Sequence, residues 1–162
     1  VSRFSRFSYY KRADIVLEAF NRSGFPLKIV GTGPMLGKLK SKAKKNIEFL
    51  GELTDEKLAY YYENCIALVF PGNEDFGLVM AEAQLFGKPV IAYKAGGAMD
   101  IIIEGITGEF FLNQDADSFI RALKSFDERR YNKTHILKNS QRFSFEVFKS
   151  SFEKFIEKKL KI

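Results

Sequence analysis

The chain has 162 residues, the size of one domain, and its 46% hydrophobic content is sufficient for a packed core. One cysteine and one histidine exclude an intrachain disulfide, a cysteine-rich zinc site and motifs with paired histidines. The net charge of +6 is compatible with nucleic acid, an anionic membrane surface or a phosphorylated small molecule as partner, and also with a simple lysine-rich solvated surface.

No run of about 18 apolar residues occurs, so no transmembrane helix is predicted and a cytoplasmic location is expected. The chain begins abruptly at Val1, inside the end of a predicted strand. We therefore expect residues 1–162 to form a single domain that belongs to a longer protein.

Short apolar runs that end at glycine or proline alternate with helical patterns along the chain. After the strand end at 1–3, further strands are predicted at 27–30, 47–50, 66–70, 89–93 and 108–111. These runs are continuous rather than alternating, which is typical of parallel strands buried on both faces.

Helices are predicted between the strands from their ends and their apolar stripes. One follows Asp14 and stops at Gly24, and Thr54 is the predicted N-cap of the next. Others are predicted at 78–86, closed by Gly87 as C-cap, at 116–126 and at 145–161. This order predicts an α/β fold: a Rossmann-like, doubly wound parallel sheet of about six strands flanked by helices.

Ligands of such sheets bind beyond the carboxyl ends of the strands, where the intervening loops meet. Arg3 and Lys11 place cations there, and Gly31 and Gly33 allow backbone amides to approach an anion. Two glycines after a strand are equally typical of a plain tight turn. A third glycine, Gly37, comes one residue too late for the dinucleotide fingerprint.

Two alternatives stay open at this stage. Glu52 lies about where a ribose-binding acid is found in dinucleotide-binding domains, which keeps an oxidoreductase domain possible. The +6 charge keeps a basic module for nucleic acid or membrane surfaces possible.

Glu74 precedes the helix predicted to start at Leu78, and Glu82 lies within that helix. Their spacing suits two acceptors for different hydroxyls of one elongated ligand better than two carboxyls flanking one bond. A loop charge and a solvated helix residue are the plainer interpretation of the same pattern.

The segment from Glu74 to Glu82 resembles the E-x7-E signature of the family 4 retaining glycosyltransferases, and other motifs follow in the order of that family over nearly the whole chain. These motifs begin with Lys11-Arg12-Ala13-Asp14-Ile15 and continue with Ile29-Val30-Gly31-Thr32-Gly33-Pro34, 47–51, Phe70-Pro71, Gly87-Lys88-Pro89-Val90-Ile91-Ala92, Gly96-Gly97 and Gly105-Ile106-Thr107-Gly108.

The resemblance implies a GT-B fold of two Rossmann-like domains, of which this chain is the C-terminal, donor-binding one. It implies that Arg3 and Lys11 contact the diphosphate of a nucleotide sugar and that Glu74 accepts sugar hydroxyls. Glu82 is expected to accept ribose hydroxyls. The remaining donor-binding residues that it implies are Gly31, Gly33, Leu53, Phe76, Gly77, Leu78 and Gly97.

No metal and no cofactor are expected, because cations and amides replace the metal at the diphosphate. The loop from Arg3 to Lys11 is longer than in similar sequences, so Arg6 is an alternative to Arg3.

Residues from Tyr10 to Asn21 and from Phe70 to Gly77 look most like the mannosyltransferases of bacterial polysaccharide synthesis, which implies GDP-mannose as donor. The acceptor is then a glycan or a lipid-linked sugar, bound by an N-terminal domain absent from this chain. We expect the chain alone to be inactive and to have no nucleic-acid partner. Peripheral contact of the whole enzyme with the inner face of the membrane is compatible with this function.

Overall fold

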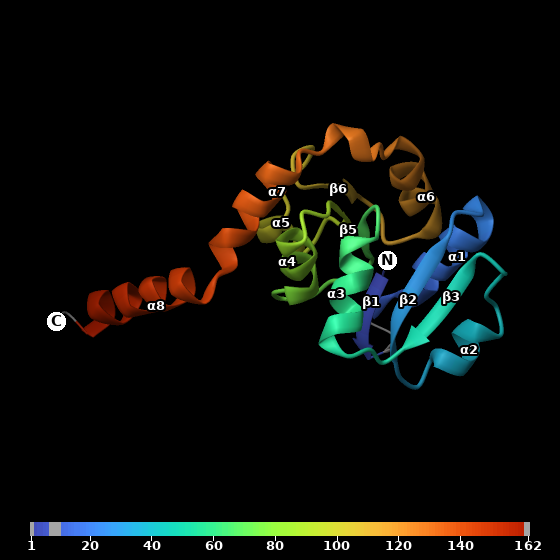
Figure 1. The fold of residues 1–162 in the computed structure, drawn as a ribbon, viewed down its shortest axis with the longest axis horizontal. Helices are drawn as coiled ribbons and strands as arrows, with labels where there is room; N and C mark the ends of the chain where they lie inside the picture. Colours follow the sequence, from blue (N-terminus) through green and yellow to red (C-terminus); the bar gives the residue numbers. More distant parts are fainter. Residues whose placement is uncertain (1, 7–10, 161–162) are drawn as a thin grey trace.

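The computed structural model describes residues 2–6, there as backbone, and residues 11–160. These residues form one α/β unit (Figure 1). Its strands are β1 Ser2–Arg6, β2 Leu27–Thr32, β3 Ile47–Gly51, β4 Leu68–Phe70, β5 Val90–Tyr93 and β6 Gly108–Phe111. Its helices are α1 Ala13–Ser23, α2 Leu36–Lys40, α3 Asp55–Glu63, α4 Leu78–Leu85, α5 Ala98–Ile101, α6 Ala116–Ser125, α7 Lys133–Ser140 and α8 Phe145–Leu160, with 3₁₀ turns at Glu128–Arg130 and Gln141–Phe143.

All strand pairs of the described residues are parallel, as the apolar runs predict. Backbone hydrogen bonds join β1, β2 and β3 into one sheet and β4, β5 and β6 into another. Strand β1 contacts β4, so the six strands lie in the order 3-2-1-4-5-6. The predicted parallel α/β fold is confirmed, with hydrogen bonding divided between two halves rather than continuous through one sheet.

Apolar side chains of alternate strand residues fill two separate core clusters. On β4, Val69 belongs to the cluster under α1 and α6, whereas Leu68 and Phe70 belong to the cluster under α3 and α4. Successive side chains of a strand point to opposite faces, so both faces of the sheet are covered by helices. This double burial explains why the strands read as continuous apolar runs.

Helix ends agree with the sequence at two positions and differ slightly at a third. Gly24 ends α1 with φ 76°, and Thr54 caps α3 by accepting a hydrogen bond from the Lys57 amide. Helix α4 ends at Leu85 with Phe86 as its C-cap, so Gly87 follows the cap instead of forming it. The strand predicted at 66–70 begins only at Leu68.

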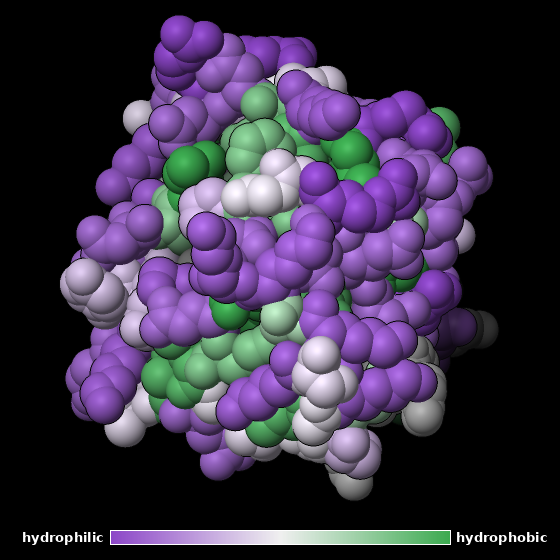
Figure 2. All heavy atoms as spheres, turned by 90° about the vertical axis from the view of Figure 1, so that its right-hand side faces the viewer, coloured by the Kyte–Doolittle hydropathy of each residue, from purple (hydrophilic) through white to green (hydrophobic). Residues whose placement is uncertain are grey.

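Helices α5 and α7 were not anticipated, and one predicted helix is unlike the rest. Helix α5 has four residues, and the sparse apolar residues of α7 gave no helical stripe. Helix α8 was predicted, but it projects from the α/β body and has no buried residue (Figure 1). The opposite side of the molecule, which carries α1, α2 and β3, is largely hydrophilic with apolar atoms between the polar ones (Figure 2).

Candidate functional site

The carboxyl ends of β1 and β4 bring together two side chains that the sequence predicts to act at one site. The ammonium of Lys11 donates to Glu74 Oε1 at 2.5 Å, and the two side chains are 11% and 22% exposed. Lys11 follows β1, and Glu74 lies on the loop between β4 and α4. A cation and an acid that are distant in the sequence therefore meet at the edge of the sheet where such folds bind ligands.

The turn that carries Lys11 is held by close backbone packing and by Arg12. A Cβ atom on Gly72 would lie 3.4 Å from Cα of Lys11. Arg12 has a left-handed φ of 51° at the N-cap of α1, and its guanidinium pairs with Asp14. It also donates to Gln114 at 3.3 Å, and this amide donates to the Pro71 carbonyl at 2.9 Å. These contacts connect the turn to the end of β4.

The loop that carries Glu74 lies against two glycines that follow β5. The Gly97 amide donates to the Glu74 carbonyl at 2.8 Å. A Cβ atom on Gly97 would overlap the Phe76 carbonyl, and one on Gly96 would overlap the Glu74 carbonyl. Gly97 was predicted to bind the donor; in the structure its amide holds the backbone of Glu74, and its missing side chain allows the loop to approach.

Glu82 lies on the second turn of α4 and is oriented from α3. The hydroxyl of Tyr62 donates to Glu82 Oε2 at 3.1 Å. Tyr62 is almost completely buried, and its ring stacks on Phe86 with centroids 5.3 Å apart. This role of Tyr62 could not be predicted, because no sequence feature of α3 distinguishes Tyr62 from Tyr60 and Tyr61.

At the start of α4, Gly77 is the N-cap with φ 79°, and the side chains of Phe76 and Leu78 are exposed beside it. Gly31 near the end of β2 and Gly33 just after it have φ of 128° and 142°, which permits the tight turn into α2. This turn neighbours the end of β1, where Arg6 is in register with Thr32. Arg3 was predicted as a partner of the diphosphate, with Arg6 as its alternative, and the side chains of both lie outside the described part of the structure.

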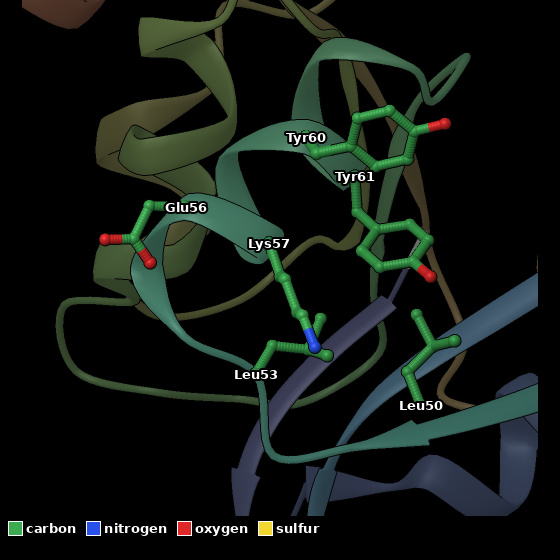
Figure 3. Close-up of a pocket in the computed structure, with 6 residues that line it drawn as sticks. All are labelled: Leu50, Leu53, Glu56, Lys57, Tyr60 and Tyr61. Atoms are coloured by element: carbon green, nitrogen blue, oxygen red, sulfur yellow. The ribbon is translucent and has the colours of Figure 1, made fainter.

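A surface cavity of about 380 Å³ lies between α3 and the end of β3 (Figure 3). Leu53, predicted to contact the donor, lines it together with Leu50, Glu56, Lys57, Tyr60 and Tyr61. Both tyrosine rings and both leucines face the cavity, whereas the Glu56 carboxylate points away from them (Figure 3).

Within residues 11–160, no three His, Cys, Asp or Glu side chains are grouped so as to hold a metal ion. No helix in the described part of the chain combines the length and the hydrophobicity of a membrane span.

Comparisons with known proteins agree on one family. Residues 3–143 match the family of glycosyl transferases group 1. The O-antigen chain mannosyltransferase C of Escherichia coli is 34% identical over 116 residues, which are 67% of this chain and 29% of that protein. The D-rhamnosyltransferase WbpZ of Pseudomonas aeruginosa is 36% identical over 108 residues, 62% of this chain and 28% of that protein.

Two solved structures have the same fold as this chain over nearly its whole length. Alr3699/HepE of Anabaena, in complex with UDP-glucose, has a TM-score of 0.80 at 23% identity, covering 97% of this chain and 48% of that one. A glycosyltransferase of Rickettsia africae has a TM-score of 0.83 at 19% identity, covering 99% of this chain and 47% of that one. The chain thus spans under a third of those two curated relatives and about half of these structures.

Proposed function

The chain belongs to the glycosyl transferases group 1, and from this we propose that it binds a nucleotide-sugar donor at the Lys11–Glu74 pair. One observation carries the proposal: the little-exposed contact of 2.5 Å between Lys11 and Glu74 at the carboxyl ends of β1 and β4. Family membership gives no support to an oxidoreductase domain or a nucleic-acid module, the alternatives that composition left open.

In this proposal Lys11 and Glu74 bind different parts of the donor. The ammonium of Lys11 exchanges Glu74 for the diphosphate, because both form charge-assisted contacts with an ammonium and the diphosphate carries more negative charge. Glu74 then accepts hydrogen bonds from sugar hydroxyls. The amides of Phe76, Gly77 and Leu78 lie at the N-terminus of α4, where the helix dipole favours negative charge.

Glu82 is proposed to accept the ribose hydroxyls, and Tyr62 keeps its carboxylate in place from the buried side. Leu53 and the cavity that it lines are proposed to contact the base. Gly31 and Gly33 are proposed to line the diphosphate on the side of β2.

We further propose that the transfer is retaining and metal-independent, as in family 4. The bond between the anomeric carbon and the diphosphate oxygen breaks, and the oxygen of an acceptor hydroxyl bonds to the anomeric carbon. Negative charge develops on the departing phosphate, which takes up the proton of that hydroxyl. Lys11, already positioned by the fold, stabilises that charge without a metal ion. A second cation at Arg3, or at Arg6, stays a prediction from the sequence.

We propose that the transferred sugar is mannose and the donor GDP-mannose. The similarity of this chain to the Escherichia coli mannosyltransferase supports this. The acceptor is proposed to be a glycan or lipid-linked sugar in polysaccharide or cell-envelope synthesis. A second domain would bind it, which agrees with the share of the solved structures that the chain covers. The exposed apolar side chains of α8, among them Phe148 and Phe152, offer a surface for that domain. A cytoplasmic location, with peripheral contact to the inner face of the membrane, completes the proposal.

Calorimetry of the chain with GDP-mannose, GDP, UDP and ADP tests the proposal. We expect GDP-mannose and GDP to bind, and Lys11→Ala to weaken both at least about 10-fold, as the loss of a charged contact of ~1.5–3 kcal/mol implies. At 100 times its Kd, the ligand stabilises the fold by ~2.7 kcal/mol.

Arg22→Ala is the matched control, because Arg22 also pairs with an acid, Asp117, but on exposed parts of α1 and α6 and in the last turn of α1, far along that helix from Lys11. A folded chain that binds no nucleoside diphosphate contradicts the proposal. Sugar transfer by this chain alone would contradict the expectation that a second domain supplies the acceptor.

A further inference from the structure

We infer that Phe143 is a positioning residue for the loop that carries Glu74, an inference that rests on the proposed function. Phe143 ends the 3₁₀ turn Gln141–Phe143, and its ring meets that of Phe76 edge-on. The ring centroids lie 6.1 Å apart with an interplanar angle of 89°, a favourable geometry for an aromatic pair. Phe76 lies two residues after Glu74, so the contact acts directly on the site loop.

Phe143 is itself fixed from behind by Arg142. The Arg142 guanidinium lies over the Phe143 ring, 5.3 Å from its centroid. One of its nitrogens donates to Asn139 Oδ1 at 2.8 Å, and another to the Asp100 carbonyl at 3.4 Å. Arg142 is exposed, but these two contacts restrict its orientation and thereby that of the ring beside it.

Asn139 connects this assembly to the helix that carries Glu82. Its side-chain nitrogen donates to Gln84 Oε1 at 2.6 Å and to the Ile101 carbonyl at 2.7 Å. Asn139 and Gln84 are buried, and Gln84 lies on α4 two residues after Glu82. Because buried amides with satisfied hydrogen bonds are costly to displace, Asn139 is a rigid anchor.

The segment from Asn139 to Phe143 thus contacts both halves of the donor site, α4 through Gln84 and the loop through Phe76. On its other side the loop is held by the hydrogen bond from the Gly97 amide to the Glu74 carbonyl. Removing the ring of Phe143 leaves α4 in place and loosens the loop. Glu74 should therefore lose its position toward the sugar, while Glu82 keeps its position toward the ribose.

The test compares two probes, GDP-mannose and GDP, on Phe143→Ala and on Phe143→Tyr. We expect Phe143→Ala to bind GDP-mannose about 3- to 10-fold more weakly, the effect of losing one aromatic contact, and GDP within about 2-fold of the parent. Exchange of the Gly97 amide hydrogen, followed by NMR, should accelerate by a similar factor. Phe143→Tyr keeps the ring and should restore both values.

Phe126→Ala is the matched control, since Phe126 is also partly buried and stacks on Tyr131 at 5.2 Å, but beside α6. It should change neither the ratio of the two affinities nor the exchange of the Gly97 amide. If Phe143→Ala does not fold, Phe143→Leu, which removes the ring but keeps apolar volume, takes its place.

Equal weakening of both ligands, or unchanged exchange at Gly97, overturns the inference, because either shows that Phe143 only packs. If the parent chain binds neither ligand, the proposed function fails. The exchange of the Gly97 amide then still decides whether Phe143 holds the loop.

Discussion

Glu74→Gln is expected to strengthen the binding of GDP, although it removes a residue of the proposed site. In the structure Glu74 holds the ammonium of Lys11 at 2.5 Å, so a diphosphate has to displace a carboxylate from its cation. Glutamine keeps the shape of the side chain and removes its charge, which weakens the contact with Lys11 that the phosphates have to replace.

The size of the effect follows from the burial of the pair. Exposed ion pairs contribute up to about 1 kcal/mol, whereas breaking a fully buried pair costs about 3–5 kcal/mol. Exposures of 11% and 22% place the pair between these limits, at about 1–2 kcal/mol. GDP should then bind about 5- to 30-fold more tightly to Glu74→Gln.

GDP-mannose should gain less, because the variant also loses the hydrogen bonds of a charged acceptor to sugar hydroxyls. The amide oxygen of glutamine still accepts such bonds, but at about 0.5–1.5 kcal/mol in place of about 1.5–3 kcal/mol, so the preference for GDP-mannose over GDP should fall about 5- to 10-fold. Titration calorimetry with both ligands measures the two affinities and their ratio.

Asp117→Asn is the control, since Asp117 forms a comparable but more exposed pair with Arg22 at 2.5 Å between α1 and α6. It should leave both affinities unchanged. Weaker or unaltered GDP binding to Glu74→Gln would refute the reasoning, because it would show that Glu74 and the diphosphate do not compete for Lys11.

Three further predictions concern the surroundings of the site. Tyr62→Phe should weaken GDP binding about 3- to 10-fold by calorimetry, because Glu82 loses its orienting hydroxyl; unchanged affinity would remove Tyr62 from the site. Asn139→Leu should lower the free energy of unfolding in urea by about 1–3 kcal/mol, since it leaves Gln84 Oε1 without this donor in the interior, and an unaltered midpoint would contradict that. Burial raises the pKa of the Cys65 thiol, so at about pH 8 less of it is thiolate than in glutathione. Ellman's reagent should therefore react more slowly with Cys65 than with glutathione, and the rate should still rise above about pH 9. A rate equal to that of glutathione would argue against burial of the thiol.

The strands could be predicted from the sequence because their signal is local. Leu68, Val69 and Phe70 are apolar in succession since each faces one of two covered sides of the sheet. Helix α7 escaped prediction because its stability depends on distant partners. Its buried Asn139 forms hydrogen bonds with α4 and with the Ile101 carbonyl. Contacts of this kind produce no periodic pattern of apolar residues in the sequence.

The candidate site was predictable as a set of residues but not as a set of contacts. The family resemblance indicated Lys11 and Glu74 as groups facing a ligand, and it contained no sign that they face each other. Gly97 was likewise recognised as important, although its contact is with the carbonyl of Glu74. Tyr62 and Phe143 belong to no motif. An aromatic residue in a helix or turn is ordinarily part of a core, so neither residue indicates a binding site from the sequence.

The two acids of the E-x7-E segment are held in different ways, and this difference separates their proposed functions. Glu82 accepts from a buried hydroxyl on α3, a partner that ligand binding leaves in place. Glu74 lies on a loop and pairs with a cation that a diphosphate also attracts. Under the proposed function, nucleotide recognition uses a preformed group, whereas sugar recognition requires an exchange of partners. The diphosphate thereby releases Glu74 for the sugar, so the acid that selects the sugar becomes available only after the phosphates have bound to Lys11.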